Sequence, residues 1–153
     1  MLDLGRTFLQ SVDRSANTTA LVDGSVRLTW GEWARAIGGV QRGLAALGLR
    51  HGDHFLSVLQ NRYEAATFPW ACQFSGLVMT PLNWRAKPEE VDYVLRDSEA
   101  RLLVFEAASE ESLESSVLGK TVTRMAVGTV RSEANRFDDL FKERRDPTPL
   151  ARS

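Results

Sequence analysis

From residue 54 onward, short apolar runs alternate with longer amphipathic runs, and this alternation constrains the fold most. Strands are predicted for 54–61, 77–83, 101–106 and 121–128, in the segments HFLSVLQN, LVMTPLN, RLLVFE and TVTRMAVG. Helices are predicted for 62–76 and 87–98, where Pro88 suits a first helical turn. Alternating strands and helices predict an α/β fold, with a mainly parallel sheet, flanking helices and βαβ units.

The helix predicted for 62–76 has two features that the structure can test. Tyr63, Ala66, Trp70 and Phe74 fall roughly in helical register, which supports the helix. Pro69 lies inside the segment, and a proline there is expected to kink the helix or mark a restart.

An N-terminal helix and a short hairpin are predicted to precede these units. Leu4, Phe8, Leu9 and Val12 share one helical face, and Asp23-Gly24 between two apolar runs is a hairpin signal. The next helix is predicted for 29–47, with a capping box formed by Thr29 and Glu32. Its apolar stripe comprises Trp30, Trp33, Ile37, Val40, Leu44 and Leu47.

Two adjacent glycines, Gly38 and Gly39, interrupt this helix and weaken it by ~1 kcal/mol each relative to alanine. They indicate close packing against another element. The predicted stop is Gly48, directly after the last residue of the stripe.

The bulk composition excludes several classes of protein. The 153 residues contain 19 Lys and Arg against 20 Asp and Glu, so no excess charge favours nucleic acid or an anionic membrane. No apolar run approaches the ~20 residues of a membrane span, and Asp3 in the amphipathic start argues against a secretory signal. A single cysteine, Cys72, agrees with a reducing compartment. We therefore expect a cytoplasmic protein.

Two motifs, in order and at the right spacing, carry a family resemblance. LTWGEW at 28–33 is similar to an early Leu-Thr-Tyr-x-Glu-Leu signature, and SGLVMTPLN at 75–83 to a glycine-containing strand that ends in Pro-Leu-Asn. With GLAALGLRHGD and LQNRYEAA between them, the chain resembles the N-terminal part of AMP-forming acyl-CoA synthetases, in the adenylate-forming superfamily. The resemblance is clear over 4–106 and looser beyond. Peptide-synthetase members usually carry Asp at the position of Asn83.

The resemblance implies a two-step reaction in which a carboxylic acid attacks ATP and CoA then displaces AMP from the acyl-adenylate. Such an enzyme uses ATP, Mg²⁺ and CoA, and a glycine-rich phosphate loop that ends in lysine. The only Gly-Lys pair here, Gly119-Lys120, follows ESSVL and does not fit that loop. We therefore expect no catalytic residue in this chain, and no activity from it alone.

In this interpretation, residues 1–135 form an N-terminal α/β subdomain, and 136–153 form a terminal helix and a linker toward a catalytic part. The linker expectation follows from Pro147, Pro149 and the polar residues around them. The alternative is a stand-alone, non-catalytic interaction module derived from the same fold. Fatty, aryl and short branched acids all stay open as substrates, and a homo-oligomer is compatible with the sequence.

The corner at Asn83, Trp84 and Arg85 is the candidate binding site. The resemblance places it near the CoA nucleotide, where Arg85 would meet a phosphate and Trp84 would stack on adenine. The competing interpretation is a packed turn capped by Asn83. His51 and His54 lack further ligands nearby in the sequence, so we expect a surface turn and no metal site, and Cys72 among apolar neighbours is expected to be buried.

Overall fold

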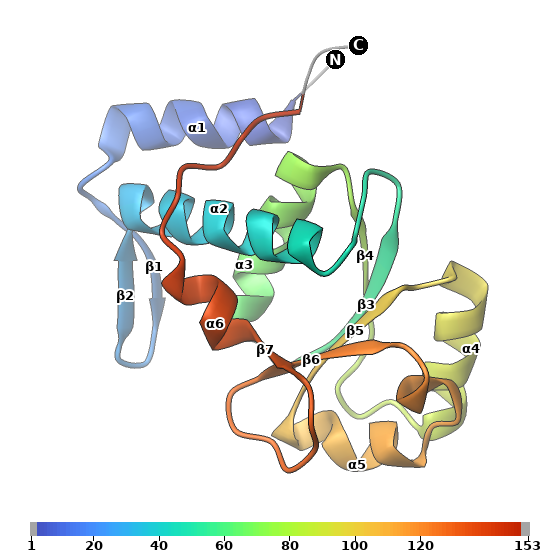
Figure 1. Cartoon of the computed structure of the whole chain (residues 1–153). Helices are drawn as coiled ribbons and strands as arrows, with labels where there is room; N and C mark the ends of the chain where they lie inside the picture. The colour runs from blue at the N-terminus through green and yellow to red at the C-terminus, as the bar shows by residue number, and fades with distance from the viewer. Residues whose placement is uncertain (1–2, 151–153) are drawn as a thin grey trace.

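The structure is a computed structural model that describes residues 3–150. Five parallel strands form its centre (Figure 1). The sheet runs in the order β4-β3-β5-β6-β7. Its strands are β3 (His54–Val58), β4 (Val78–Pro81), β5 (Leu102–Glu106), β6 (Thr123–Val127) and β7 (Asn135–Arg136). The predicted α/β fold with a parallel sheet is confirmed. β7 was not predicted, because two polar residues carry no strand pattern.

Helices cover both faces of the sheet, so the buried strands alternate between two apolar layers. On β3, Phe55 packs with α2 and α3 on one face, whereas Leu56 packs with α4 and α5 on the other. Figure 1 shows these two groups of helices on opposite sides of the strands. The helices are α1 (Leu4–Ser15), α2 (Trp30–Ala46), α3 (Tyr63–Ser75), α4 (Pro88–Ser98), α5 (Ala107–Ser115) and α6 (Phe137–Lys142), with the 3-10 turn η1 (Leu118–Lys120). No helix within residues 3–150 is both long and apolar enough to span a membrane.

The N-terminal elements form as predicted. β1 (Thr19–Asp23) and β2 (Val26–Thr29) make an antiparallel hairpin that turns at Gly24, whose φ of 56° suits glycine. The Thr29 side chain accepts a hydrogen bond from the Glu32 amide at 3.2 Å, and the Glu32 carboxylate accepts one from the Thr29 amide at 2.9 Å. This capping box starts α2.

Helix α3 is continuous through Pro69, and three of the four residues predicted in register, Tyr63, Trp70 and Phe74, pack in the core. Ala66 is exposed, whereas Glu64, Thr67, Phe68 and Ala71 are buried. Helix α3 packs against α2 as well as the sheet side of the core, so more than one of its faces is covered. The buried surface of α3 is therefore wider than the set of residues in register indicated.

The segment after β6 returns to α2. Phe137 at the start of α6 is fully buried in the core beneath α2 and α3, and residues 143–150 then run extended beside α2 (Figure 1). The predicted division between residues 135 and 136 falls inside β7. Residues 1–2 of the predicted subdomain and 151–153 of the predicted linker lie outside the described residues.

Candidate functional site

The candidate site lies at the carboxyl ends of the parallel strands, where open α/β sheets bind their ligands. The chain leaves β3 toward α3 and β4 on one side, and leaves β5 toward α5 and β6 on the other. The boundary between β3 and β5 is therefore the point at which the connections change direction. The predicted corner, Asn83 to Arg85, follows the neighbouring edge strand β4.

The corner after β4 is a tight turn held by its own polar groups. The Asn83 side-chain oxygen accepts a hydrogen bond from the Arg85 amide at 2.9 Å, and the Asn83 carbonyl accepts one from the Ala86 amide at 2.8 Å. Helix α4 begins two residues later at Pro88, where the Glu90 carboxylate accepts from the Lys87 amide at 2.7 Å. Asn83 thus has the turn-forming role that the competing interpretation gave it.

Trp84 and Arg85 are brought together by this turn. The guanidinium carbon of Arg85 lies 4.2 Å from the centre of the Trp84 ring, which is a cation–π distance. Trp84 is half-buried and Arg85 is exposed. No ion pair within residues 3–150 involves Arg85 or Lys87, so both cations are free to meet an anion.

A hollow of about 420 Å³ separates the corner from α5. The corner supplies one wall with Trp84, Arg85, Lys87 and Pro88 among its residues, and α5 supplies the other with Ala108, Glu111, Ser112 and Ser115. The exposed Glu111 carboxylate makes the α5 wall unfavourable for a phosphate, whereas Arg85 and Lys87 make the corner wall favourable. The corner wall therefore carries one aromatic ring and two positive charges.

The point between β3 and β5 is filled by a buried ion cluster that the sequence analysis missed. The Arg62 guanidinium donates two hydrogen bonds to Glu64, at 2.7 and 3.0 Å, and one to Glu106 at 2.9 Å. The Glu64 and Glu106 side chains are only 2% and 7% exposed. A glutamate that ends the apolar run LLVFE was the available signal, because a buried strand seldom ends in an unpaired charge.

The role of this ion cluster is to stabilise the fold. Burial alone would lower the pKa of Arg62, but hydrogen bonds and attraction from Glu64, and then from Glu106, raise it above its ordinary value. Glu106 also accepts a hydrogen bond from the Gln60 amide in the loop after β3. Both carboxylates are therefore occupied, and the cluster fixes that loop without presenting a free acid or base.

The two histidines and the cysteine are the remaining candidate residues. His51 is exposed in the turn before β3, and His54 is half-buried at the start of β3. Within residues 3–150, no group of three or more His, Cys, Asp and Glu side chains is arranged to hold a metal ion. Cys72 is 5% exposed, and burial raises the pKa of its thiol to about 12, so the thiol stays protonated at neutral pH.

Known proteins resemble this chain in sequence and in fold. A sequence model of the family "AMP-binding enzyme" matches residues 8–151. The chain is 28% identical over 137 residues to a feruloyl-CoA synthase of Amycolatopsis sp, covering 90% of this chain and 28% of the relative. It is 33% identical over 122 residues to a long-chain-fatty-acid–CoA ligase of Mycobacterium tuberculosis, covering 78% and 20%.

The whole of this chain matches part of a solved structure in fold. A benzoate CoA ligase from Burkholderia xenovorans LB400 superposes with a TM-score of 0.86 at 17% identity, covering 100% of this chain and 31% of that one. The chain thus spans about a third or less of the length of each of these three proteins.

Proposed function

This chain belongs to the family of AMP-binding enzymes, and we propose that it forms the N-terminal portion of an AMP-forming acyl-CoA synthetase. In that reaction, a carboxylate oxygen attacks the α-phosphorus of ATP, and pyrophosphate leaves. The CoA thiol then attacks the acyl carbon, and AMP leaves as thioester forms. The observation that carries the proposal is the family match across residues 8–151.

The corner after β4 would serve the second step by holding the nucleotide part of CoA. Arg85 offers a planar, uncompensated guanidinium on the exposed side of the turn, a geometry suited to two hydrogen bonds to a phosphate. Arg85 lies over the Trp84 ring, so adenine would stack on Trp84 as Arg85 turns to the phosphate, and Lys87 adds a second positive charge on the same wall of the hollow. Asn83 contributes by shaping the turn.

Residues 1–135 would act as the α/β subdomain, and 136–153 would lead toward the parts that bind ATP and Mg²⁺. The sequence contains no glycine-rich phosphate loop, so residues 1–153 alone should not catalyse acid-dependent exchange of pyrophosphate into ATP. Exchange above background in a preparation free of host ligases would contradict the proposal that the catalytic groups lie outside residues 1–153. It would leave the family membership untouched.

The role of the corner is tested by Arg85→Ala in a protein that carries these residues together with the rest of the ligase. The KM for CoA should rise by roughly fivefold to 150-fold, the equivalent of one charge-assisted contact, whereas acyl-adenylate formation should be spared. Arg85→Lys should recover only part of the loss, because lysine keeps the charge without the planar fork. Arg96→Ala, at an exposed position in α4, is the matched control. If both half-reactions fall together, Arg85 is structural.

A further inference from the structure

Residues 143–150, hereafter the strap, leave the C-terminal end of α6 and cross α2 in extended form. Of these residues only Pro147 is buried. The Arg145 amide donates to the Arg35 carbonyl at 3.0 Å, and the Arg144 side chain donates to the Glu32 carbonyl at 3.3 Å. The strap is thus held by polar contacts to α2 with almost no apolar burial of its own.

The two glycines in the middle of α2 make this approach possible. A Cβ on Gly38 would collide with the carbonyl oxygen of Arg145, and one on Gly39 with the carbonyl oxygen of Glu143. Without side chains, α2 presents bare backbone, and the strap comes near enough to bond to it. This accounts for a Gly-Gly pair that intrinsically weakens the helix.

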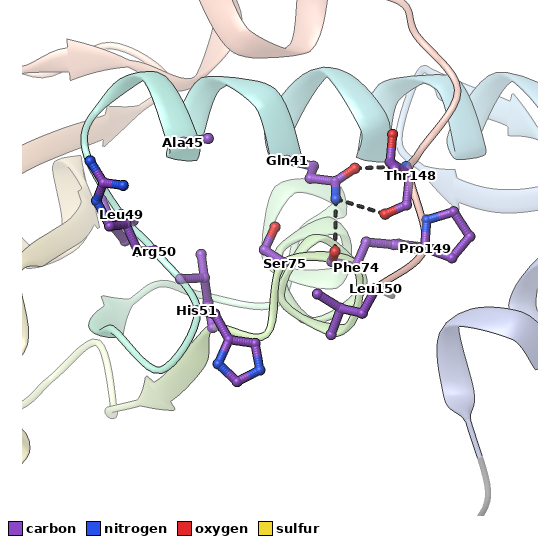
Figure 2. Close-up of a pocket in the computed structure, with 11 residues that line it drawn as sticks. Gln41, Ala45, Leu49, Arg50, His51, Phe74, Ser75, Thr148, Pro149 and Leu150 are labelled. Atoms are coloured by element: carbon purple, nitrogen blue, oxygen red, sulfur yellow. Dashed lines mark hydrogen bonds between the residues drawn. The ribbon is translucent and has the colours of Figure 1, made fainter. Parts of the chain in front are cut away.

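Gln41, one turn further along α2, secures the strap through its side-chain amide (Figure 2). Its nitrogen donates to the Thr148 carbonyl at 2.9 Å, and its oxygen accepts from the Thr148 amide at 2.9 Å. The same nitrogen donates to the Phe74 carbonyl at 2.7 Å, at the end of α3. One side chain therefore reproduces the pair of bonds that a neighbouring strand would make, and ties the strap to two helices.

The closed strap completes a hollow of about 280 Å³ beside α2 and α3. Thr148, Pro149 and Leu150 supply one wall. The other walls include Gln41 and Ala45 of α2, Arg50 and His51 of the loop before β3, and Phe74 and Ser75 of α3 (Figure 2). Moving the strap would remove that wall.

We propose that the strap opens and closes over α2 independently of the core, with Gln41 as its latch. The hinge is the end of α6, because everything before it is fixed: Phe137 is fully buried, and its ring lies 5.2 Å from that of Phe68. Segments with few apolar contacts and exposed hydrogen bonds are the ones that open at low cost. The strap depends on the fold of residues 3–150 and not on the reaction proposed above.

Limited trypsinolysis under native conditions tests the strap, because it contains the two cleavage sites Arg144 and Arg145. Gln41→Glu keeps the acceptor for the Thr148 amide, but it loses both donated bonds and sets a carboxylate against two carbonyl oxygens. Cleavage at Arg144 and Arg145 should then accelerate about tenfold or more, because cleavage follows the population of the open form. Gly39→Ala should do the same by pushing on the Glu143 carbonyl, although alanine favours the helix.

Two controls separate strap opening from unfolding. Gln73→Glu makes the same chemical change on α3 at an exposed glutamine that forms no side-chain hydrogen bond within the described residues, and it should leave cleavage unchanged. Cleavage at Arg96 in α4 reports on the core and should stay constant in all variants. The proposal is overturned if strap cleavage rises only together with Arg96 cleavage. It is also overturned if neither Gln41→Glu nor Gly39→Ala accelerates strap cleavage, or if the unaltered protein is already cleaved at Arg144 and Arg145 at once.

Discussion

Arg62 shows how a single side chain organises the carboxyl edge of the sheet. It bridges Glu64, in the first turn of α3, and Glu106, at the end of β5, and so ties two non-adjacent segments at the point where the strand connections diverge. One guanidinium faces two carboxylates in a largely buried site. Removing either glutamate would leave Arg62 paired with the other one, whereas removing Arg62 leaves two buried negative charges without a partner.

Arg62→Leu should therefore destabilise the protein by about 3–5 kcal/mol, the usual result of leaving buried charges unpaired. Arg101→Leu is the matched control, since Arg101 also bridges a carboxylate, Asp53 at 2.8 Å, but its side chain is 56% exposed. That exposed pair should be worth about 0–1 kcal/mol. Urea unfolding of both variants measures the difference, and equal midpoints would mean that the cluster is better hydrated than its burial indicates.

Glu110 should make stability depend on pH. Burial alone would raise its pKa, but hydrogen bonds from the Ser132 side chain and amide and from Arg131 outweigh it, so the pKa is lowered from the ordinary 4.5. A carboxyl with a depressed pKa stabilises the fold above its unfolded pKa and loses that contribution as pH falls through the folded value. Glu110→Gln should thus lower the urea midpoint at pH 7, and the gap should shrink below about pH 4. A gap that stays constant down to pH 3 would show that the Glu110 pKa is not depressed.

The corner residues illustrate how far residue-level prediction reached. Pro88 and the Pro-Leu-Asn pattern located the turn between β4 and α4 correctly, because both depend on local backbone preferences. The stacking of Arg85 on Trp84, and the Glu111 carboxylate across the hollow, depend on side-chain direction and on a helix more than twenty residues away. Only the structure could supply those two facts.

At the scale of elements, helix α2 was predicted well because its two ends carry local signals, although neighbours cover more than one of its faces. Helix α2 spans Trp30–Ala46, and the prediction was 29–47. The agreement is close because neighbouring residues form both the capping box at the start and the glycine stop at the end. Helix α3 was predicted with too narrow a buried surface, because it is covered on more than one side. Its buried Glu64 is paired with Arg62 just before the helix, whereas its buried Thr67 has a distant partner. Thr67, for example, accepts a hydrogen bond from the Trp33 indole at 3.1 Å.

Trp33 joins α2 to α3 and α1, and its removal should cost more than that of any exposed residue. Its ring lies 5.5 Å from Phe8 and 6.3 Å from Trp70, and it is 7% exposed. Trp33→Ala should lower stability by about 3–5 kcal/mol, as expected for an aromatic deletion in a packed core. Arg85→Ala, on the exposed side of the corner, should stay within about 0.5 kcal/mol. Identical urea midpoints for the two variants would mean that the aromatic cluster contributes little.

At the scale of the molecule, the least predictable part was the path of the chain after β6. The polar, proline-containing sequence from 143 onward predicted a linker, yet the strap bonds to α2 through Arg145 and Thr148. The partners in each of these contacts are at least 107 residues apart in the sequence, a separation that no local pattern encodes. The Gly-Gly pair in α2 did indicate a close neighbour, but not which segment it would be.

The two apolar layers share one sheet, and they should therefore unfold together. Each buried strand contributes to both layers, so losing one layer would expose the other face of the same strands, as Leu103 and Val104 on β5 illustrate. Trp30, Trp33 and Trp70 all belong to the layer of α1, α2 and α3, which makes tryptophan fluorescence largely a probe of that side.

Leu113→Ala on α5 removes a fully buried side chain from the opposite layer and should cost about 2–5 kcal/mol. Because the layers are coupled through the sheet, the variant should shift the fluorescence midpoint in urea as far as the far-ultraviolet circular dichroism midpoint. Ile37→Ala, in the tryptophan layer, is the reciprocal variant and should behave alike. If Leu113→Ala moved only the circular dichroism curve, the α4–α5 layer would be a separately unfolding unit, and the sheet would not transmit the loss between its faces.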